Sequence, residues 1–183
     1  MAKLTFRYGV MSSGKSLKLL SEAYDLDQAG REVILLKPSI DTRTTNTIKS
    51  RLGVERECIV IDEDTCLLNM CSMSNNTVVL IDEAQFLTLA QVEELRMLAS
   101  MGVEVICYGL LTTFQRKLFK GTQRLLELAD DIMEYEGRCQ LCGEKAHINA
   151  RMVNGVITTT GNEVEIGDTQ YISLCEKCYL ENL

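Results

Sequence analysis

The sequence predicts an α/β protein whose mostly parallel sheet is flanked by helices, with a smaller second domain at the C-terminal end. Up to residue 137, apolar runs with β character alternate with segments of helical periodicity. A glycine-rich segment, residues 9–16, joins the first apolar run to the first helical segment. Two Cys-x-x-Cys pairs follow the last predicted strand. We therefore expect a larger domain over residues 1–137 and a smaller one over residues 138–183.

The segment Gly-Val-Met-Ser-Ser-Gly-Lys-Ser at residues 9–16 has the spacing and the strand–helix context of a phosphate-binding P-loop. Its glycines permit close approach of backbone N–H groups, and the following helix adds its positive dipole end. Lys15 would reach the β- and γ-phosphates, and the Ser16 hydroxyl would be a ligand of Mg²⁺. The alternative is an ordinary Gly/Ser-rich turn. The candidate phosphate-binding residues are Gly9, Met11, Ser12, Ser13, Gly14, Lys15 and Ser16.

The next elements follow directly from local pattern. A helix is expected over residues 16–28, ending at Gly30, and an aliphatic strand over residues 32–36 is ended by Lys37 and Pro38. Residues 39–56 are polar and rich in Thr, Ser and basic side chains, which indicates a long, mobile loop. This loop is either solvated surface or a segment that closes over substrate.

The central part continues the alternation. Strands are expected over residues 58–61, 77–81, 103–108 and 131–135. Residues 62–65 can cap a short helix reaching about residue 73, Thr88 can cap a helix over residues 89–99, and a further helix is expected over residues 122–129 after an irregular stretch, residues 109–119. This order predicts a RecA-like sheet with active-site loops at the carboxyl ends of its strands.

Asp82 and Glu83 directly follow the most strand-like run, where P-loop proteins place the carboxylate that orients Mg²⁺. Asp82 would hold the metal, and Glu83 could take the proton from an attacking hydroxyl or water. Such a pair suits phosphoryl transfer, which depends on positioning and on neutralisation of charge. The alternative is an acidic helix cap after a strand.

Cys139, Cys142, Cys175 and Cys178 form a C-x-x-C…C-x-x-C set with 32 residues between the pairs. Each pair can grip one ion in a tight turn, and four thiolates close a tetrahedral zinc site that leaves no position open, so we predict a structural zinc. The intervening segment would be a ribbon or loop held by the metal, because it carries little apolar material. Redox-active pairs are the alternative.

The remaining reactive side chains have simpler interpretations. Cys58, Cys66, Cys71 and Cys107 lie in or beside apolar runs and are interpreted as buried thiols. His147, the single histidine, is interpreted as a surface or structural residue.

Composition limits the classes of function. With 183 residues, 46% hydrophobic and 25% charged, the chain can bury one ordinary core and a small appendage. A formal charge of −7 disfavours nucleic-acid partners. No segment approaches the roughly 20 apolar residues that span a bilayer, so we expect no membrane partner and a cytoplasmic location.

The P-loop, the run Asp82-Glu83-Ala84-Gln85-Phe86, Gly109-Leu110 with Phe114, and the cysteine pairs around Tyr171 together resemble the zinc-containing, cellular-type (type II) thymidine kinases. This resemblance covers nearly the whole chain. It implies transfer of the γ-phosphate of ATP to the 5′-hydroxyl of thymidine or deoxyuridine, with Mg²⁺ and a structural Zn²⁺. Glu83 then matches the catalytic base and Asp82 the Walker B acid. Gln85, Asp41 and Arg43 match positions near the nucleotide phosphates.

The resemblance also implies a pocket for the base, closed by a lasso between the cysteine pairs. Aromatic and sulfur-containing side chains suit a planar, methylated base, although ordinary core packing is the alternative for each. The matching residues are Met11, Phe86, Leu110, Phe114, Phe119, Ile166, Gly167 and Tyr171. A homotetramer inhibited by thymidine triphosphate is implied as well.

Two other functions remain open at this point. Asp82-Glu83-Ala84-Gln85 also resembles a helicase-type Walker B motif, and zinc ribbons often bind nucleic acid, so a P-loop ATPase acting on DNA or RNA is the alternative. Its second lobe and arginine-rich motifs are missing from the sequence. A third hypothesis is a zinc-stabilised regulator that binds nucleotide without turnover.

Overall fold

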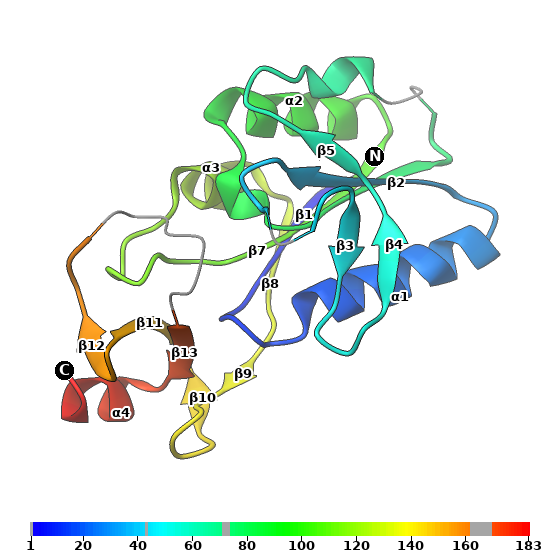
Figure 1. Cartoon of the computed structure of the whole chain (residues 1–183). Helices are drawn as coiled ribbons and strands as arrows, with labels where there is room; N and C mark the ends of the chain where they lie inside the picture. Colours follow the sequence, from blue (N-terminus) through cyan, green and yellow to red (C-terminus); the bar gives the residue numbers. More distant parts are fainter. Residues whose placement is uncertain (1, 43, 71–73, 162–169) are drawn as a thin grey trace.

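The computed structural model describes residues 2–42, 44–70, 74–161 and 170–183, and within these ranges its main feature is a six-stranded sheet (Figure 1). The strand order is β5-β2-β6-β7-β1-β8, and every pairing is parallel. The strands are β1 (Leu4–Tyr8), β2 (Glu32–Pro38), β5 (Ile59–Ile61), β6 (Thr77–Ile81), β7 (Glu104–Gly109) and β8 (Asp131–Glu134). The predicted α/β fold with a parallel sheet is thus confirmed.

Helices cover both faces of this sheet (Figure 1). Helix α1 (Lys15–Gln28) packs on one face, while α2 (Leu89–Ser100) and α3 (Lys120–Leu128) pack on the other. Adjacent residues of β2 accordingly enter opposite cores: Leu35 packs with Leu19 of α1, and Leu36 with Leu95 of α2. Because both faces are buried, the strands read as almost continuous aliphatic runs.

Helix α2 begins where its cap was predicted. The Thr88 hydroxyl accepts from the N–H of Gln91 at 3.2 Å, and the Gln91 side chain accepts from the Thr88 N–H at 3.1 Å, which completes a capping box. The predicted short helix before β6 is only a 3₁₀ turn, η1 (Leu67–Asn69), and residues 71–73 lie outside the described ranges. Residues 62–65 do not cap it, because Glu94 of α2 accepts the Leu67 N–H at 2.6 Å.

The prediction of a loop over residues 39–56 is wrong for its second half. β3 (Thr47–Lys49) and β4 (Glu55–Glu57) form an antiparallel hairpin that lies beside α1 (Figure 1). Ile48 is only 2% exposed and packs with Leu19 and Leu35. One apolar side chain thus anchors this polar hairpin to the core. A single apolar residue is too short a pattern to predict a strand.

The C-terminal part of the chain packs around an apolar cluster that is separate from the two cores of the parallel sheet. β9 (Gly137–Arg138) and β10 (Lys145–Ala146) form one hairpin, and β11 (Ile148–Val153), β12 (Val156–Thr158) and β13 (Gln170–Leu174) form an antiparallel sheet next to α4 (Glu176–Glu181). The buried residues of this cluster are Ala146, Ile148, Ala150, Ile157, Leu174 and Tyr179, three of the paired cysteines, and Val10 of the P-loop. β9 runs across the predicted domain boundary at residues 137/138, which stays a prediction.

The other cysteines differ in burial. Cys107 is buried as expected, whereas Cys58 and Cys66 are only half-buried, and Cys71 lies outside the described residues. Burial raises the pKa of the Cys58 thiol to about 11 and that of Cys107 further still. His147 is exposed, as expected. In the part of the chain that the structure describes, none of the helices has the length and apolar character to cross a membrane.

Candidate active site and metal centre

The P-loop runs from the end of β1 into α1 with the backbone that a phosphate cradle requires. Gly14, the residue before α1, has φ 81°, and Ser12 also has a positive φ, 63°. A Cβ on Gly9 would lie 2.4 Å from the carbonyl oxygen of Tyr135, so only glycine fits at that position. The loop is closed by a hydrogen bond of 3.3 Å from the Ser13 N–H to the Val10 carbonyl.

Lys15 lies inside this loop. Its buried ammonium donates to the carbonyl oxygens of Gly9 at 3.0 Å and Val10 at 2.8 Å. The charge is therefore held over the loop, where an anion would meet it together with the N–H groups at the start of α1.

Ser16 and Asp82 meet across the sheet edge, although they are 66 positions apart. The Ser16 hydroxyl donates to Asp82 Oδ2 at 2.8 Å, and Asp82 is buried behind the end of β6. A hydroxyl and a carboxylate at this distance are the oxygen donors that Mg²⁺ prefers. These two side chains therefore form a candidate magnesium site.

Glu83 directly follows and has a left-handed backbone, with φ 53° and ψ 37°. Such strain in a residue other than glycine is typical of functional sites. Its carboxylate accepts from Gln85 Nε2 at 2.5 Å, while Gln85 Oε1 accepts from the Leu110 N–H at 2.9 Å. The buried Gln85 thus connects the predicted base to the end of β7, where Leu110 begins the predicted nucleoside pocket.

The predicted pocket residues form two aromatic pairs. Phe86 and Phe119 are packed edge to face with ring centres 5.7 Å apart, and Phe114 faces Tyr171 of β13 at 6.5 Å. The Arg151 guanidinium lies 5.2 Å from the Phe114 ring, a contact that the sequence did not reveal. Residues of β11 and β13 therefore meet the segment after β7 around Phe114.

Asp41 follows the carboxyl end of β2 and is paired with a lysine that sequence reasoning took only for the end of a strand. Lys37 is 1% exposed, and its ammonium lies 3.7 Å from the Asp41 carboxylate. It also donates to the Thr44 carbonyl and hydroxyl at 2.6 and 2.7 Å. Arg43, Ile166 and Gly167, which were predicted with Asp41 or with the base pocket, lie outside the described residues.

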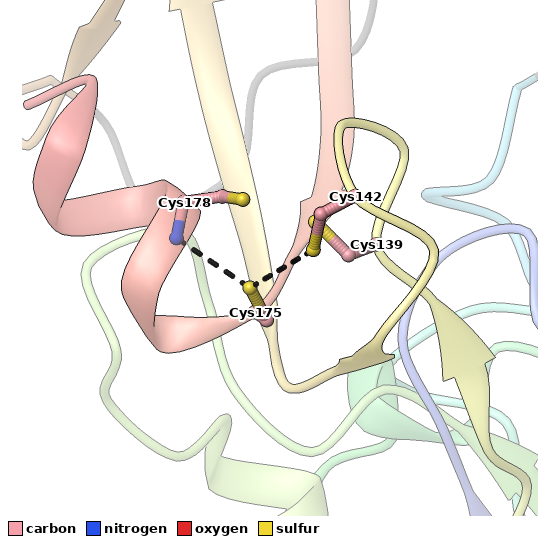
Figure 2. Close-up of side chains that lie close together, drawn as sticks. All are labelled: Cys139, Cys142, Cys175 and Cys178. Atoms are coloured by element: carbon pink, nitrogen blue, oxygen red, sulfur yellow. Dashed lines mark hydrogen bonds between the residues drawn. The ribbon is translucent and has the colours of Figure 1, made fainter.

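The four paired cysteines converge on one point (Figure 2). Their sulfur atoms all lie within 4.8 Å of one another, and the Cys142 and Cys175 sulfurs are 3.6 Å apart. A tetrahedral zinc with Zn–S bonds of about 2.3 Å places sulfur atoms about 3.8 Å apart, so the donor set fits this ion.

The protonation of these thiols favours the same conclusion. Although burial raises the pKa of Cys139, backbone N–H donors outweigh it and lower this pKa to about 6. The hydrogen-bonded contact with Cys142, followed by burial, raises the pKa of Cys178. Crowded thiolates repel one another, and a metal ion bound among them would offset their charge.

Two polar residues of the C-terminal domain that sequence reasoning missed reach into the P-loop. Asn149 of β11 accepts the Met11 N–H at 2.7 Å, and the Ser173 hydroxyl of β13 donates to the Met11 carbonyl at 2.7 Å. No local pattern marks either residue, because their role is set by contacts between segments far apart in the chain.

Comparison with known proteins identifies the family of this chain. The family model described as thymidine kinase matches residues 2–179. A thymidine kinase of Enterobacteria phage T4 is 39% identical, covering 99% of this chain and 97% of that protein. Those of Lactococcus lactis and Streptococcus thermophilus are 37% and 40% identical, covering 99% and 97% of this chain and 98% and 93% of theirs. The chain therefore belongs to the thymidine kinase family and is an ATP-dependent nucleoside kinase.

Proposed function

We propose that the chain transfers the γ-phosphate of ATP to the 5′-hydroxyl of thymidine or deoxyuridine, with Glu83 as the general base. The observation that carries this proposal is the hydrogen bond from Ser16 to Asp82, with Glu83 next in the chain. It brings the predicted phosphate, metal and base positions to one edge of the sheet. The phage and bacterial relatives carry the name thymidine kinase, which supports thymidine as the substrate.

The P-loop would bind the phosphates of ATP. Backbone N–H groups from Gly9 to Ser16 and the Lys15 ammonium would neutralise their charge. Ser16 and Asp82 would hold Mg²⁺, which supplies charge neutralisation to the phosphates when bound. Asp41 and Arg43 are proposed to contribute to the same phosphate site.

Glu83 would accept the proton of the 5′-hydroxyl as its oxygen attacks the γ-phosphorus. Gln85 donates a hydrogen bond to the Glu83 carboxylate and so holds it toward the end of β7. A carboxylate held in this way needs little reorganisation when it takes the proton. Gln85 is accordingly proposed as part of the nucleotide site.

The nucleoside base would lie against the aromatic pairs. We place it among Met11, Phe86, Leu110, Phe114, Phe119 and Tyr171, with Ile166 and Gly167 of the lasso covering it. Rings packed edge to face leave flat faces and apolar edges that suit a planar base carrying a methyl group. The lasso would join this pocket to the cysteine centre, because Tyr171 lies on β13 just before Cys175.

The remaining proposals concern the whole enzyme. Cys139, Cys142, Cys175 and Cys178 would hold a structural zinc, since their sulfurs fit a tetrahedral ion. A homotetramer, inhibition by thymidine triphosphate and action in the cytoplasm are proposed from the family resemblance, with neither a nucleic acid nor a membrane as partner.

The test is phosphate transfer from Mg·ATP to thymidine, deoxyuridine, deoxycytidine and deoxyguanosine, measured beside ATP hydrolysis with single-stranded DNA or RNA added. We expect transfer to thymidine and deoxyuridine, little to the other two nucleosides, and no stimulation by nucleic acid. Absence of transfer, together with ATP hydrolysis stimulated by DNA or RNA, would replace the kinase with a nucleic-acid ATPase.

A further inference from the structure

We propose that Asn149 and Ser173 are positioning residues of the phosphate-binding loop: through them, the cysteine-containing domain sets the P-loop conformation that binds Mg·ATP. This inference rests on the proposed function in one respect, namely that the P-loop binds ATP. It gives the C-terminal domain a second task beyond covering the nucleoside.

The first observation is the geometry of the two hydrogen bonds. Asn149 Oδ1 accepts the N–H of Met11 and the Ser173 hydroxyl donates to the C=O of Met11, each at 2.7 Å. Both backbone groups of one P-loop residue are thus bound by side chains of the other domain. Hydrogen bonds of this length between neutral groups are well formed.

The second observation is that the pair is built into the C-terminal sheet. Asn149 and Ser173 are direct partners in the antiparallel register of β11 and β13, so their side chains leave the same face of the sheet. They are only 4% and 1% exposed. Buried polar side chains keep their bonding partners because water cannot replace them, so Met11 is held firmly.

The third observation is that Val10, the neighbour of Met11 in the P-loop, packs against apolar residues of the C-terminal domain. Val10 is buried in the cluster that contains Ile148 and Leu174. A Cβ on Gly137 would lie 2.2 Å from a methyl carbon of Val10, so glycine at the start of β9 permits this approach. Residues 10 and 11 are therefore fixed from outside the P-loop domain.

Fixing residues 10 and 11 affects the conformation of the next residues of the P-loop. Ser12 has φ 63°, a conformation that L residues other than Asn and Asp rarely adopt, and Gly14 has φ 81°. A strained loop of this kind keeps its form only where its surroundings hold it. With Met11 bound at both its N–H and its C=O, the loop is arranged before ATP arrives, which lowers the cost of ordering on binding.

The test compares wild type with Asn149→Leu, Ser173→Ala and the double variant. Each single change should weaken the Kd for Mg·ATP by about threefold to tenfold, the equivalent of one lost hydrogen bond. The double variant should weaken it by less than the product of the two, because both side chains hold one residue. Hydrogen exchange at the amides of residues 10–14 should accelerate in every variant.

Two further variants separate positioning from general damage. Ser173→Thr retains the hydroxyl and should restore most of the affinity that Ser173→Ala loses. Thr158→Val removes a hydroxyl from the neighbouring strand β12, and this hydroxyl is hydrogen-bonded at the strand end, to Thr160. Because no contact with the P-loop is lost, this variant should leave the Kd for Mg·ATP within about twofold of wild type. Zinc content and melting temperature are measured on each protein to verify that the domain stays folded.

Unchanged affinity in the double variant, with zinc retained, would overturn the inference, as would faster exchange without weaker binding. Direct binding of ATP keeps this test separate from the proposed reaction. A wild type that binds Mg·ATP but phosphorylates no nucleoside would refute the proposed function and leave the inference standing if the variants bind more weakly. A wild type that binds no ATP would refute both.

Discussion

At the scale of single residues, Glu83 combines two features that belong together in a general base. Its backbone is left-handed, and its carboxylate accepts a hydrogen bond from Gln85, which orients it. The geometry therefore suits a group that must take up a proton.

Glu83→Gln tests this role, because the amide keeps the size of the side chain but cannot accept a proton. We expect phosphate transfer to slow by roughly two to four orders of magnitude, while the Kd for Mg·ATP stays close to wild type. Single-turnover transfer and ATP titration give the two quantities. The control is Glu63→Gln, an exposed carboxylate after the edge strand β5, which should alter neither. Loss of ATP binding in Glu83→Gln would assign Glu83 a structural role instead.

Lys37 is a residue whose burial and partners could not be predicted from the sequence. A lysine after an aliphatic run reads as the polar end of a strand, yet Lys37 belongs to β2 and its ammonium is buried among oxygen atoms of Asp41 and Thr44. The partners lie in the segment that was expected to be loop. Burial of a charge depends on partners that only the folded chain brings together.

Lys37→Met should therefore destabilise the protein by about 2–4 kcal/mol, since the carbonyl and hydroxyl of Thr44 and the carboxylate of Asp41 lose a buried cationic partner. Urea denaturation measures the free energy of unfolding. The matched control is Lys49→Met, whose exposed ion pair with Glu55 should contribute about 0.5 kcal/mol or less. Equal effects of the two changes would contradict the structural role of Lys37.

The same pair of variants separates the two readings of residues 39–56. If this segment acts on the nucleotide phosphates, the KM for Mg·ATP rises in Lys37→Met at a temperature where the protein stays folded, and it stays unchanged in Lys49→Met. An unchanged KM in both variants would leave the segment without a role in ATP binding.

At the scale of elements, local sequence patterns predicted those helices and strands that local interactions determine. Helix α2 was placed to within one residue because Thr88 and the apolar spacing specify both its start and its buried face. β6 was recognised because five consecutive apolar or β-branched residues suit a strand buried on both sides. For such elements the local sequence is sufficient to predict type and position.

Elements that depend on tertiary contacts were missed or misjudged. The hairpin of β3 and β4 has one buried apolar anchor, Ile48, and otherwise polar residues, so its sequence resembles a loop. The first N–H of η1 is bound by Glu94 of α2 and not by a residue before it in the chain. In the candidate site, the motif residues could be predicted, whereas Asn149 and Ser173 could not, because neither lies in a motif and their partner is 138 and 162 positions away.

At the scale of the whole molecule, two groups of contacts join the C-terminal part of the chain to the part that forms the parallel sheet. In one group, Asn149 and Ser173 bind the P-loop. In the other, Arg116 of the segment after β7 donates to Glu176 at 2.8 Å and lies 5.5 Å from the ring of Tyr179. The predicted phosphate and base sites are therefore both in contact with the domain that contains the cysteines.

Loss of the metal should for this reason affect more than the lasso. Cys175 caps α4, where its sulfur accepts the Cys178 N–H at 3.4 Å, and it also contacts Cys142 (Figure 2). Cys175→Ser replaces one sulfur donor with a much weaker ligand for zinc. We expect the zinc content to fall from about one ion per chain to near zero, and thymidine phosphorylation to be lost with it.

Elemental analysis of the purified protein measures the zinc, and the control is Cys66→Ser, a half-buried thiol outside the cluster, which should keep both metal and activity. Because the C-terminal domain holds an apolar core of its own, we expect Cys175→Ser to loosen this domain while the parallel sheet stays folded. Hydrogen exchange should then rise in β11 and β13 and, through Met11, in the P-loop, but not in β6 or β7. Full zinc content with full activity in Cys175→Ser would refute the structural metal site, and faster exchange confined to the C-terminal domain would show that the P-loop is held independently of the metal.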